Sequence, residues 1–526
     1  MQEVATDNGA NGTAGGVNTG QWLGFLAMVF GIFMAVLDIQ IVASSLEQIQ
    51  AGLSATQDEI TWVQTAYLVA EVVVIPLSGW LGRALSTRYL FVLSCGGFTV
   101  MSLCCALAWN LPSMIVFRAV QGLFGGAMIP LVFAVIYTLF PPRQQAAMSI
   151  VVGMVVTLAP TAGPVLGGYL TETFSWHALF LINLLPGVLV SLATWWFVRV
   201  DEPEWHLLKR IDFRGILYIV LCLGSLQYVL EEGLREEWFE SRVIVVFALL
   251  SGLSGLAMIR RELSIAHPIV DLRAFRNRNF TVGCVFSFLI GTGLYTLIFL
   301  TPVYLSSVKH LNSLQIGEYI MVTGIFQLLS AFVVGPLANK LDSRIMLSLG
   351  LLLYGLGCWI NGDLSHDAGY WEFFWPQALR GFALMFCFIP INALALGTLP
   401  LHEVKNASGL YNLMRNLGGA IGLAVANSLM IQMNTSHYAA LREAVTSASV
   451  PAQNLMAGLQ ARLAETGNGD DYAAAISLIQ GYAQREAVVL TLNTLFQLLG
   501  GAFFLALLLM PWVNPVNPKA RSTTDH

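Results

Sequence analysis

The stretch from Trp62 to Arg88 reads WVQTAYLVAEVVVIPLSGWLGRALSTR, and it decides the class of fold. Roughly twenty of its residues form an apolar run long enough to cross a bilayer, and Arg83 and Arg88 follow where such a helix would end. One carboxylate, Glu71, lies near the middle of the run. Because an ionised side chain at that depth costs roughly 3 kcal/mol, we expect Glu71 to bind a proton or to face a polar cavity.

The composition of the whole chain excludes a water-soluble fold. Of its 526 residues, 56% are hydrophobic and 11% are charged, whereas roughly 25% are charged in ordinary soluble domains. We therefore predict an all-α integral membrane protein. The polar, Gly-rich residues 1–20 predict a disordered cytoplasmic tail, and the seven cysteines, all in apolar runs, predict buried thiols.

Fourteen apolar runs are long enough to span a bilayer, and an even number places both termini on one side. With the N-terminus inside, the inner segments hold seventeen Lys and Arg residues and the outer segments hold six, so both termini are predicted to be cytoplasmic. The runs cover 22–44, 62–81, 89–109, 113–138, 148–170, 178–198, 214–230, 242–259, 280–302, 315–337, 345–361, 374–399, 407–431 and 489–511.

The two halves of the chain share short sequences. PLSGWLGRALSTR from Pro76 has a counterpart in PLANKLDSR from Pro336, and AVQGLFGGAMIP from Ala119 resembles ALRGFALMFCFIP from Ala378. Direct repeats of this kind build transporters with a central cavity. The predicted division is a six-helix bundle over 21–199, two inserted helices over 200–279, a second six-helix bundle over 280–512, and a cytoplasmic tail over 513–526.

One predicted outer segment, residues 432–488, is far longer than the other loops. It carries two helical patterns rich in Ala and Leu, separated by GNGDD. Loops of this length are functional or disordered, and the apolar spacing here favours folded structure. A docking surface for another protein and a cap over the outer mouth are equally compatible with the sequence.

Four further charged side chains are predicted inside the membrane. Asp38 and Arg118 each lie about six residues from the outer end of a helix, roughly 9 Å deep, so we expect them to pair because each alone would be costly. The pair can take part in proton coupling or simply hold helices together. Arg380 and Arg415 are candidates for the substrate cavity, although packing between helices explains such arginines more often.

Glu71 is the main candidate for proton coupling. It lies nearer the midplane than Asp38, and no basic residue is predicted at its depth in the first half, so burial favours the form that carries a proton. The alternative is a permanently protonated Glu71 held by Gln64, Thr65 or Gln121. Gln64 and Gln121 are also candidates for the substrate cavity.

A glycine-rich segment, APTAGPVLGGYL, lies in the fifth apolar run. Its glycines let another helix backbone approach closely, while its second proline removes a backbone hydrogen bond and can bend the helix. A pliable helix between two halves would suit a rocking motion, and simple close packing explains the residues equally well. The residues concerned are Gly163, Pro164, Gly167 and Gly168.

The polar residues argue against an enzyme. No histidine is predicted deep in a span, and the sequence has no H-E-x-x-H, no G-x-S-x-G and no Walker A loop. We predict no cofactor, no metal and, with no basic tract, no nucleic-acid partner.

Six motifs, taken in order, resemble the fourteen-helix drug:proton antiporter branch (EmrB/QacA type) of the major facilitator superfamily, over nearly the whole chain. The chain departs from those motifs at Gly82, where an Asp is usual, and at Gln40 and Ala43; Glu71 is not a hallmark of the branch. The motifs are LDIQIV from Leu37, GWLGRALSTR from Gly79, RAVQG from Arg118, AGPVLGG from Ala162, PIVDLRAFRNRNF from Pro268 and SGLYNLMRNLGGAIG from Ser408.

This resemblance implies a pump of the bacterial inner membrane that works with a periplasmic adaptor (EmrA-like) and an outer-membrane channel (TolC-like). It also implies a gating role for Gly79, Arg83 and Arg88 in the loop motif and for the glycine-rich segment. The outer segment 432–488 would then be the natural contact for the adaptor.

We therefore expect an exporter that exchanges entering protons for a departing amphipathic compound, with Glu71 as proton carrier and the Asp38–Arg118 pair as second candidate. Each entering proton contributes about 2.3 kcal/mol per 100 mV and about 1.4 kcal/mol per pH unit. Two alternatives remain. One is a dedicated exporter of a metabolite or siderophore; the other is a passive channel or receptor whose buried acids are structural.

Overall fold

A computed structural model describes residues 18–338, 340–445, 449–464 and 471–515, and every regular element in these residues is a helix. The first helix begins at Thr19, where the Asn18 amide donates to the Gln21 side chain at 3.0 Å. Residues 1–17 of the predicted tail over 1–20 lie outside the described residues. So do residues 516–526 of the C-terminal tail and most of the GNGDD segment.

The first half is a bundle whose connections are short. Two small helices that the sequence did not suggest, α2 and α3, lie between its first two long ones. Its helices are α1 (Thr19–Ser44), α2 (Leu46–Leu53), α3 (Gln57–Ile60), α4 (Trp62–Ala84), α5 (Thr87–Ala106), α6 (Leu111–Leu139), α7 (Pro142–Thr173), α8 (Ala178–Leu181) and α9 (Leu184–Phe197).

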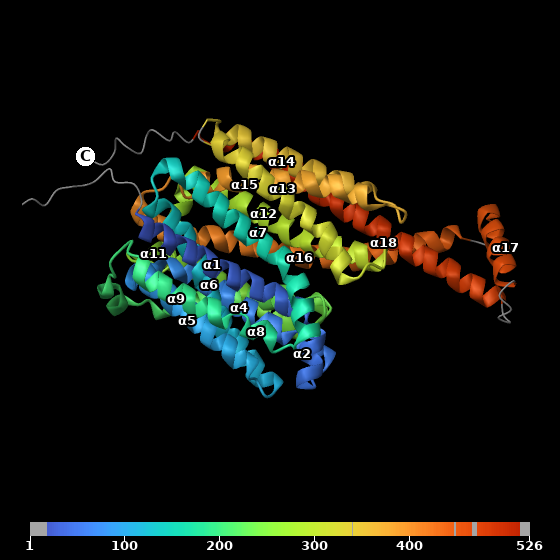
Figure 1. Ribbon diagram of the computed structural model, residues 1–526, viewed down its shortest axis with the longest axis horizontal. Helices are drawn as coiled ribbons and strands as arrows, with labels where there is room; N and C mark the ends of the chain where they lie inside the picture. The colour runs from blue at the N-terminus through green and yellow to red at the C-terminus, as the bar shows by residue number, and fades with distance from the viewer. Residues whose placement is uncertain (1–17, 339, 446–448, 465–470, 516–526) are drawn as a thin grey trace, which may run out of the picture.

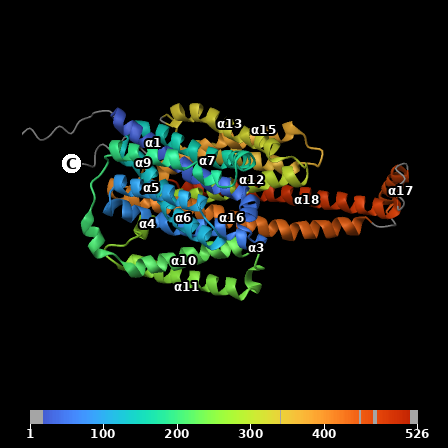
Figure 2. The ribbon, with the colours of Figure 1, turned by 60° about the horizontal axis from the view of Figure 1, so that its bottom comes forward.

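Two inserted helices, α10 (Phe213–Glu232) and α11 (Arg242–Ser264), lie side by side along the outer flank of the bundles (Figure 2). Arg261 holds one pair of their ends together by donating to both Asp212 carboxylate oxygens at 2.7 to 3.0 Å. These bonds lower the pKa of Asp212. At the other end the Thr65 hydroxyl donates to Glu232 at 2.9 Å, which fixes α10 against α4.

The second half follows the same plan, and its helices α16 and α18 are the longest in the described chain, at 44 and 36 residues. Short 3-10 turns separate some of them, and the described chain ends beyond Trp512. Its helices are α12 (Arg278–Ser307), α13 (Ser313–Ala338), α14 (Ser343–Ile360), α15 (Tyr370–Ala395), α16 (Leu401–Ala444), α17 (Val450–Ala464) and α18 (Asp471–Ala506).

Twelve helices in the described part of the chain are long and apolar enough to cross a membrane, and a thirteenth is counted if α7 is one span. α7 bends by 45° between Pro142–Pro160 and Ala162–Thr173. The predicted run 407–431, the thirteenth in chain order, is not among these spans and lies within the 44-residue α16. The chain is an all-helical, multi-pass membrane protein, and the count of fourteen spans stays a prediction.

Glycines at equivalent positions of the repeat pack the helices of each half. A Cβ atom at Gly122 of α6 would collide with the Tyr67 carbonyl of α4, and a Cβ atom at Gly381 of α15 would collide with the Thr323 carbonyl of α13. The sequence repeat from Ala119 and Ala378 therefore corresponds to the same helix contact, made twice.

Beyond the bundle, α16 and α18 continue side by side as a long hairpin with α17 at its tip (Figure 1). This hairpin contains the predicted outer segment 432–488, whose described residues are helical except at the ends of α16 and α17. It projects away from the bundle along the direction of the helices (Figures 1 and 2).

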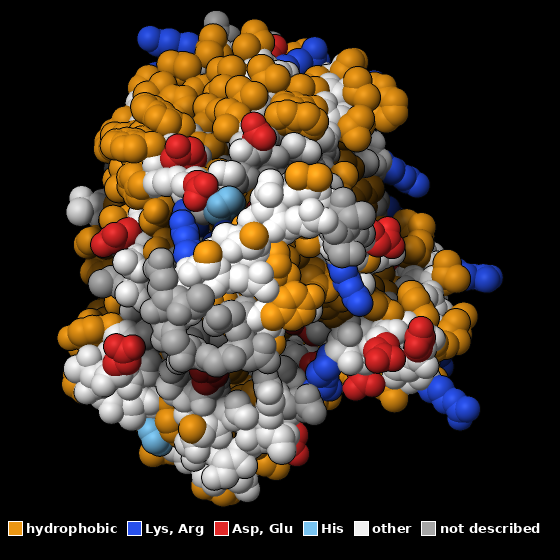
Figure 3. Space-filling model, turned by 90° about the vertical axis from the view of Figure 1, so that its right-hand side faces the viewer, with side chains coloured by type: hydrophobic (Ala, Val, Ile, Leu, Met, Phe, Trp, Pro, Cys, Tyr) orange, Lys and Arg blue, Asp and Glu red, His pale blue; other side chains and the backbone are white. Residues whose placement is uncertain are grey.

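The surface of the bundle is apolar, as a lipid-facing surface must be. Figure 3 looks onto the end that carries α17 and shows hydrophobic side chains covering the upper flank. Large exposed side chains include Phe332, Trp371 and Trp375, which are 62% to 73% exposed. In water such a surface would be a liability, whereas in a bilayer it faces lipid.

Candidate functional site

Asp38 lies at the centre of a buried hydrogen-bond network in the first half. Its carboxylate accepts from Arg118 Nη1 at 2.5 Å, from Asn183 Nδ2 at 2.8 Å and from Gln121 Nε2 at 3.4 Å. Asn183 also donates to the Ser102 hydroxyl at 3.0 Å, which holds its amide in place. The acid and base that the sequence placed at one depth thus form an ion pair with both side chains fully buried.

Arg118 is held from several sides. Its Nε donates to the Val63 carbonyl at 3.2 Å and its Nη1 donates to Gln121 at 2.8 Å. The guanidinium carbon lies 4.3 Å from the centre of the Tyr67 ring, close enough for a cation–π contact. Gln121, a candidate for the substrate cavity, therefore belongs to this network and is itself fully buried.

Glu71 lies on α4 one turn from Tyr67 and is 4% exposed. Its backbone packs on α6, because a Cβ atom at Gly126 would lie 2.7 Å from the Glu71 carbonyl oxygen. Among the described residues none makes a hydrogen bond to its carboxyl group. The charge of Arg118 acts on it, and Glu71 in turn acts on Tyr295 of α12 in the second half.

The alternative partners expected for Glu71 are elsewhere. Thr65 donates to Glu232 and Gln121 bonds to Asp38 and Arg118, so the expectation that either holds Glu71 is wrong. The Gln64 side-chain oxygen is buried and accepts no hydrogen bond within the described part of the chain. The expectation that no base lies near Glu71 is also too strict, because Arg118 is within electrostatic range.

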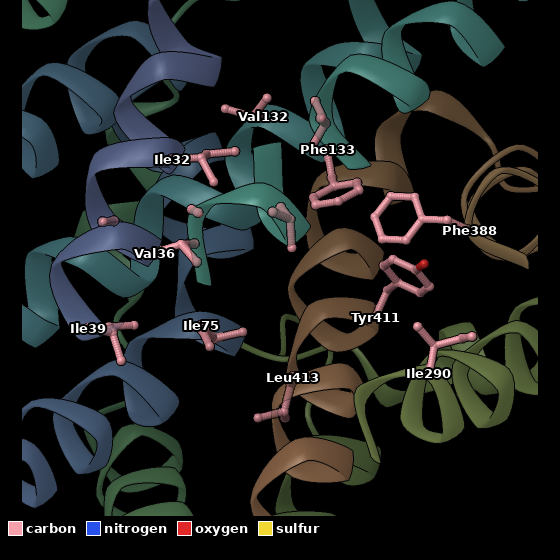
Figure 4. Packing of buried hydrophobic residues seen from close by; sticks show 14 of the residues in the cluster. Ile32, Val36, Ile39, Ile75, Val132, Phe133, Ile290, Phe388, Tyr411 and Leu413 are labelled. Atoms are coloured by element: carbon pink, nitrogen blue, oxygen red, sulfur yellow. The ribbon is translucent and has the colours of Figure 1, made fainter. Parts of the chain in front are cut away.

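The two candidate arginines of the second half have different surroundings. Arg380 packs over Gly357 of α14, and its guanidinium donates to the Asn361 amide oxygen, turned toward it, at 3.2 Å. Arg415 of α16 is 4% exposed and lies 4.7 to 5.0 Å from the ring centres of Phe388, Tyr411 and Phe133. Figure 4 shows these three rings facing one another between the two halves.

On the face that carries both chain ends, the halves are in contact. A Cβ atom at Gly79 of α4 would lie 2.6 Å from the Asn406 Cα atom and from the Lys405 carbonyl of α16. The Lys405 ammonium pairs with Asp201 and also donates to the Gly82 carbonyl at 3.3 Å. The family motif usually has an acid at position 82; here a carboxylate from a different loop, Asp201, contacts the opposite half.

The two arginines of the loop motif take different positions. The Arg83 carbonyl accepts from the Glu204 amide at 3.1 Å. Arg88 lies over Tyr89 and Trp195, 4.9 and 5.3 Å from their ring centres, within the first half. Arg88 therefore packs inside its own bundle, and the contact between halves at this face is made by Gly79 and Lys405.

The glycine-rich segment of α7 faces a helix of its own half. A Cβ atom at Gly167 would lie 2.5 Å from the Ser44 hydroxyl of α1, a Cβ atom at Gly163 would collide with Gln40, and Gly168 has no atom within 4 Å of such a position. These glycines therefore pack α7 on α1, which is the close helix approach expected of them, while other residues of α7 contact the second half. Pro164 lies just beyond the bend of α7.

The contact of α7 with the second half uses glycines of α13 instead. Cβ atoms at Gly317, Gly324 and Gly335 would lie 2.8, 2.9 and 3.3 Å from Val165, Leu158 and Ile150, respectively.

Sequence reasoning missed Asn183, Tyr295, Asp201 and Lys405. Asn183 and Tyr295 are single polar residues in apolar runs, which was a usable signal. Asp201 and Lys405 lie at predicted loop edges, where charges are ordinary, and only the folded structure brings them together.

A family model described as Major Facilitator Superfamily matches residues 28–423. The chain is 40% identical to the colistin resistance protein EmrB of Acinetobacter baumannii, over 92% of this chain and 94% of that protein. It is 30% identical to the multidrug export protein EmrB of Escherichia coli, over 93% and 94%. It is 28% identical to the fatty acid resistance protein FarB of Neisseria gonorrhoeae, over 93% and 95%.

Solved structures give the same fold. The proton:xylose symporter XylE superposes with a TM-score of 0.58 at 12% identity, covering 95% of this chain and 97% of that one. A human organic anion transporter superposes with a TM-score of 0.57 at 15% identity, covering 93% and 99%. With two repeated helical bundles, a buried acid–arginine network and these matches, the chain belongs to the major facilitator superfamily of membrane transporters.

Proposed function

We propose that this transporter exports amphipathic compounds from the cytoplasm in exchange for protons, by alternating access at the centre of the two bundles. Relatives named for multidrug export and for resistance to colistin and fatty acids support this direction of transport. The site of action is the bacterial inner membrane.

One observation carries the proton role: Glu71 is buried without a hydrogen-bond partner in the described residues, beside an arginine already bound by Asp38. A carboxylate in that position is costly when ionised, so its proton affinity depends on how much water reaches it. Opening the bundles to one side or the other changes that water access. We propose Glu71 as the proton carrier, with the paired Asp38 and Arg118 setting the electrostatics around it.

The contact between halves supports an alternating mechanism. Gly79 and the Lys405–Asp201 pair close the face that carries the chain ends, and both would have to separate for a substrate to enter from that side. Close packing without side chains at Gly79 allows the two halves to meet and part as rigid bodies. We propose that the structure represents the state closed toward the cytoplasm.

The hairpin of α16, α17 and α18 supports the proposal of a partner. We propose that it docks a periplasmic adaptor of the EmrA type, which in turn contacts a TolC-like outer-membrane channel. Exposed apolar side chains along it, including Val450, Leu455 and Tyr472, fit a surface that is covered in an assembly.

The experiment that tests the export function is dye efflux from energised cells, with wild type and Glu71→Gln at equal membrane expression. We expect a protonophore to abolish wild-type efflux and the Glu71→Gln variant to lose efflux even without it, because the amide cannot carry a proton. Normal efflux by Glu71→Gln would show that Glu71 is not the proton carrier, and Asp38 would become the next candidate.

The same assay separates the alternatives. A dedicated exporter of one metabolite would move no dye, and unrelated compounds would not compete with its substrate. A passive channel would equilibrate the dye without accumulation against a gradient and would ignore the protonophore.

A further inference from the structure

Arg415 is a buried cation without a counter-charge. It is 4% exposed, and within the described part of the chain no atom accepts a hydrogen bond from its Nε, Nη1 or Nη2. The Tyr411 hydroxyl interacts with the guanidinium without reaching hydrogen-bond geometry. A guanidinium has five N–H donors, so this side chain keeps its whole capacity to bind an anion.

The surroundings of Arg415 are three aromatic rings. Phe133 belongs to α6 in the first half, whereas Phe388 and Tyr411 belong to α15 and α16 in the second half. Cation–π contacts offset part of the cost of burying the charge, but they leave its N–H groups unsatisfied. We call these three rings the aromatic cage of Arg415. A ligand with acceptor oxygens would supply the hydrogen bonds that the cage does not.

The backbone explains why the side chain is held in this position. A Cβ atom at Gly291 of α12 would collide with the Arg415 carbonyl, and one at Gly418 would collide with the Phe288 carbonyl. The glycines pack α16 tightly on α12, so the guanidinium lies against α6 and α15 on another side of α16. Among the described residues of the second half, no Asp or Glu is buried.

We propose that Arg415 binds the anionic head group of the transported compound, a carboxylate, sulfonate or similar oxyanion, while Phe133 and Phe388 contact its apolar part. This inference rests on the proposed export function and names its substrate class. Because Phe133 is on the opposite half, separation of the halves removes one wall of the cage and uncovers the guanidinium. The anion then gains charge-assisted hydrogen bonds that Arg415 lacks in the closed state.

The anion and the proton would use different atoms at nearly the same level. The Ile75 carbonyl of α4 lies 3.0 Å from a Cβ position at Gly409 of α16, and the two helices run in opposite directions. Glu71 lies four residues from Ile75 and Arg415 lies six residues from Gly409. At 1.5 Å per helical residue, the two side chains therefore differ in membrane depth by about 3 Å. When one anion leaves and one proton enters, two elementary charges move in the same electrical sense, whereas exchange of a neutral compound moves one. The transport rate should therefore depend more steeply on membrane potential for an anion than for a neutral analogue.

The test uses three probes with the same ten-carbon chain: decanesulfonate, decyl methyl sulfoxide and decyltrimethylammonium. Their head groups are permanently negative, neutral and positive. The purified full-length protein is reconstituted into vesicles, and accumulation of each labelled probe is driven by an imposed pH gradient. Wild type, Arg415→Gln and Arg415→Lys are compared at equal protein content.

We expect wild type to accumulate the sulfonate best and Arg415→Gln to accumulate it at least about tenfold less. Arg415→Lys, which keeps the charge, should recover most of that loss. Accumulation of the cation should not fall in Arg415→Gln, because this variant removes a like charge from the site. Thermal unfolding in detergent at the wild-type temperature shows that both variants are folded.

Equal loss of all three probes in Arg415→Gln, or full retention of the sulfonate, would overturn the anion subsite while leaving export intact. A second measurement needs no variant: in wild type the sulfonate should compete with dye transport more strongly than the cation, and the reverse order would also overturn it. If wild type accumulates none of the probes and no dye, the export function itself fails.

Discussion

The two halves of the molecule share a repeat but bury opposite charges. The first half buries Asp38 and Glu71 with one arginine, whereas the described second half buries Arg380 and Arg415 with no acid. The shared contact is to a backbone carbonyl: Arg118 donates to Val63, and its counterpart Gln377 donates to Tyr319 at 2.8 Å. The same helix packing thus surrounds two acids and one arginine in the first half and two arginines in the described second half.

The largest effect should come from breaking the network that belongs to the first half alone. Asp38→Asn leaves Arg118 charged and buried without its partner, which costs about 3–5 kcal/mol of unfolding free energy. Thermal unfolding in detergent measures the loss. Adding Arg118→Gln should recover part of it, because the uncompensated charge is gone.

The stability of the single variant Asp38→Asn tests whether the pair holds the first half together. If Asp38→Asn is as stable as wild type, the pair does not hold the first half together, and Asp38 is free to act as a second proton carrier.

The next effect concerns the contact between the halves. In Gly79→Val the new side chain would meet the Asn406 backbone, 2.6 Å from the Cβ position, so the closed state should lose about 1–3 kcal/mol. That shift favours the state open toward the cytoplasm. Labelling of a cysteine placed at Lys405 should become faster, and transport should fall.

A matched control for Gly79→Val is Gly252→Val, since Gly252 of α11 has no atom within 4 Å of its Cβ position. Slower labelling in Gly79→Val, or an equal change in Gly252→Val, would contradict the assignment of this contact.

A smaller loss of stability is expected in the glycine-rich segment of α7, where two neighbouring glycines have different surroundings. Gly167→Ala should cost about 1 kcal/mol or more, because its Cβ atom would lie 2.5 Å from the Ser44 hydroxyl. Gly168→Ala should be neutral or slightly stabilising, because its Cβ position is open and alanine favours helix. Unfolding curves of both variants check this, and equal losses would show that the motif acts through something other than contact with α1.

The smallest effect is expected for the charged pair between the halves. Asp201 also accepts from the Thr87 amide at 3.0 and 3.1 Å, so its carboxylate keeps a donor in Lys405→Ala, and closure should weaken by about 1 kcal/mol. Transport should fall by no more than about fivefold, with Asp201→Asn giving the same result. A complete loss of transport in either variant would place this pair at the centre of the mechanism.

The sequence predicted the class of fold because lipid imposes simple rules: long apolar runs, charges at their ends, and a repeat visible from Pro76 and Pro336. It also predicted that Asp38 and Arg118 form a pair, because leaving either charge unpaired at that membrane depth would be costly. It could not predict which faces the helices present to one another. For that reason it did not identify α1 as the helix that Gly163 and Gly167 approach.

Long-range partners were equally out of reach. Asn183, which bonds Asp38, is 145 residues away, and Lys405 is 204 residues from Asp201. The cage around Arg415 combines rings from three helices and both halves. Such sites depend on how the bundles associate, which local apolar spacing does not encode.

The most direct test of the central claim is proton movement driven by substrate. Vesicles containing the purified protein and an internal pH-sensitive dye are given an outward substrate gradient without any imposed pH gradient. Wild type should take up protons as substrate leaves, and Glu71→Gln should show no substrate-driven proton uptake while it remains folded. Proton uptake by Glu71→Gln equal to that of wild type would contradict the account.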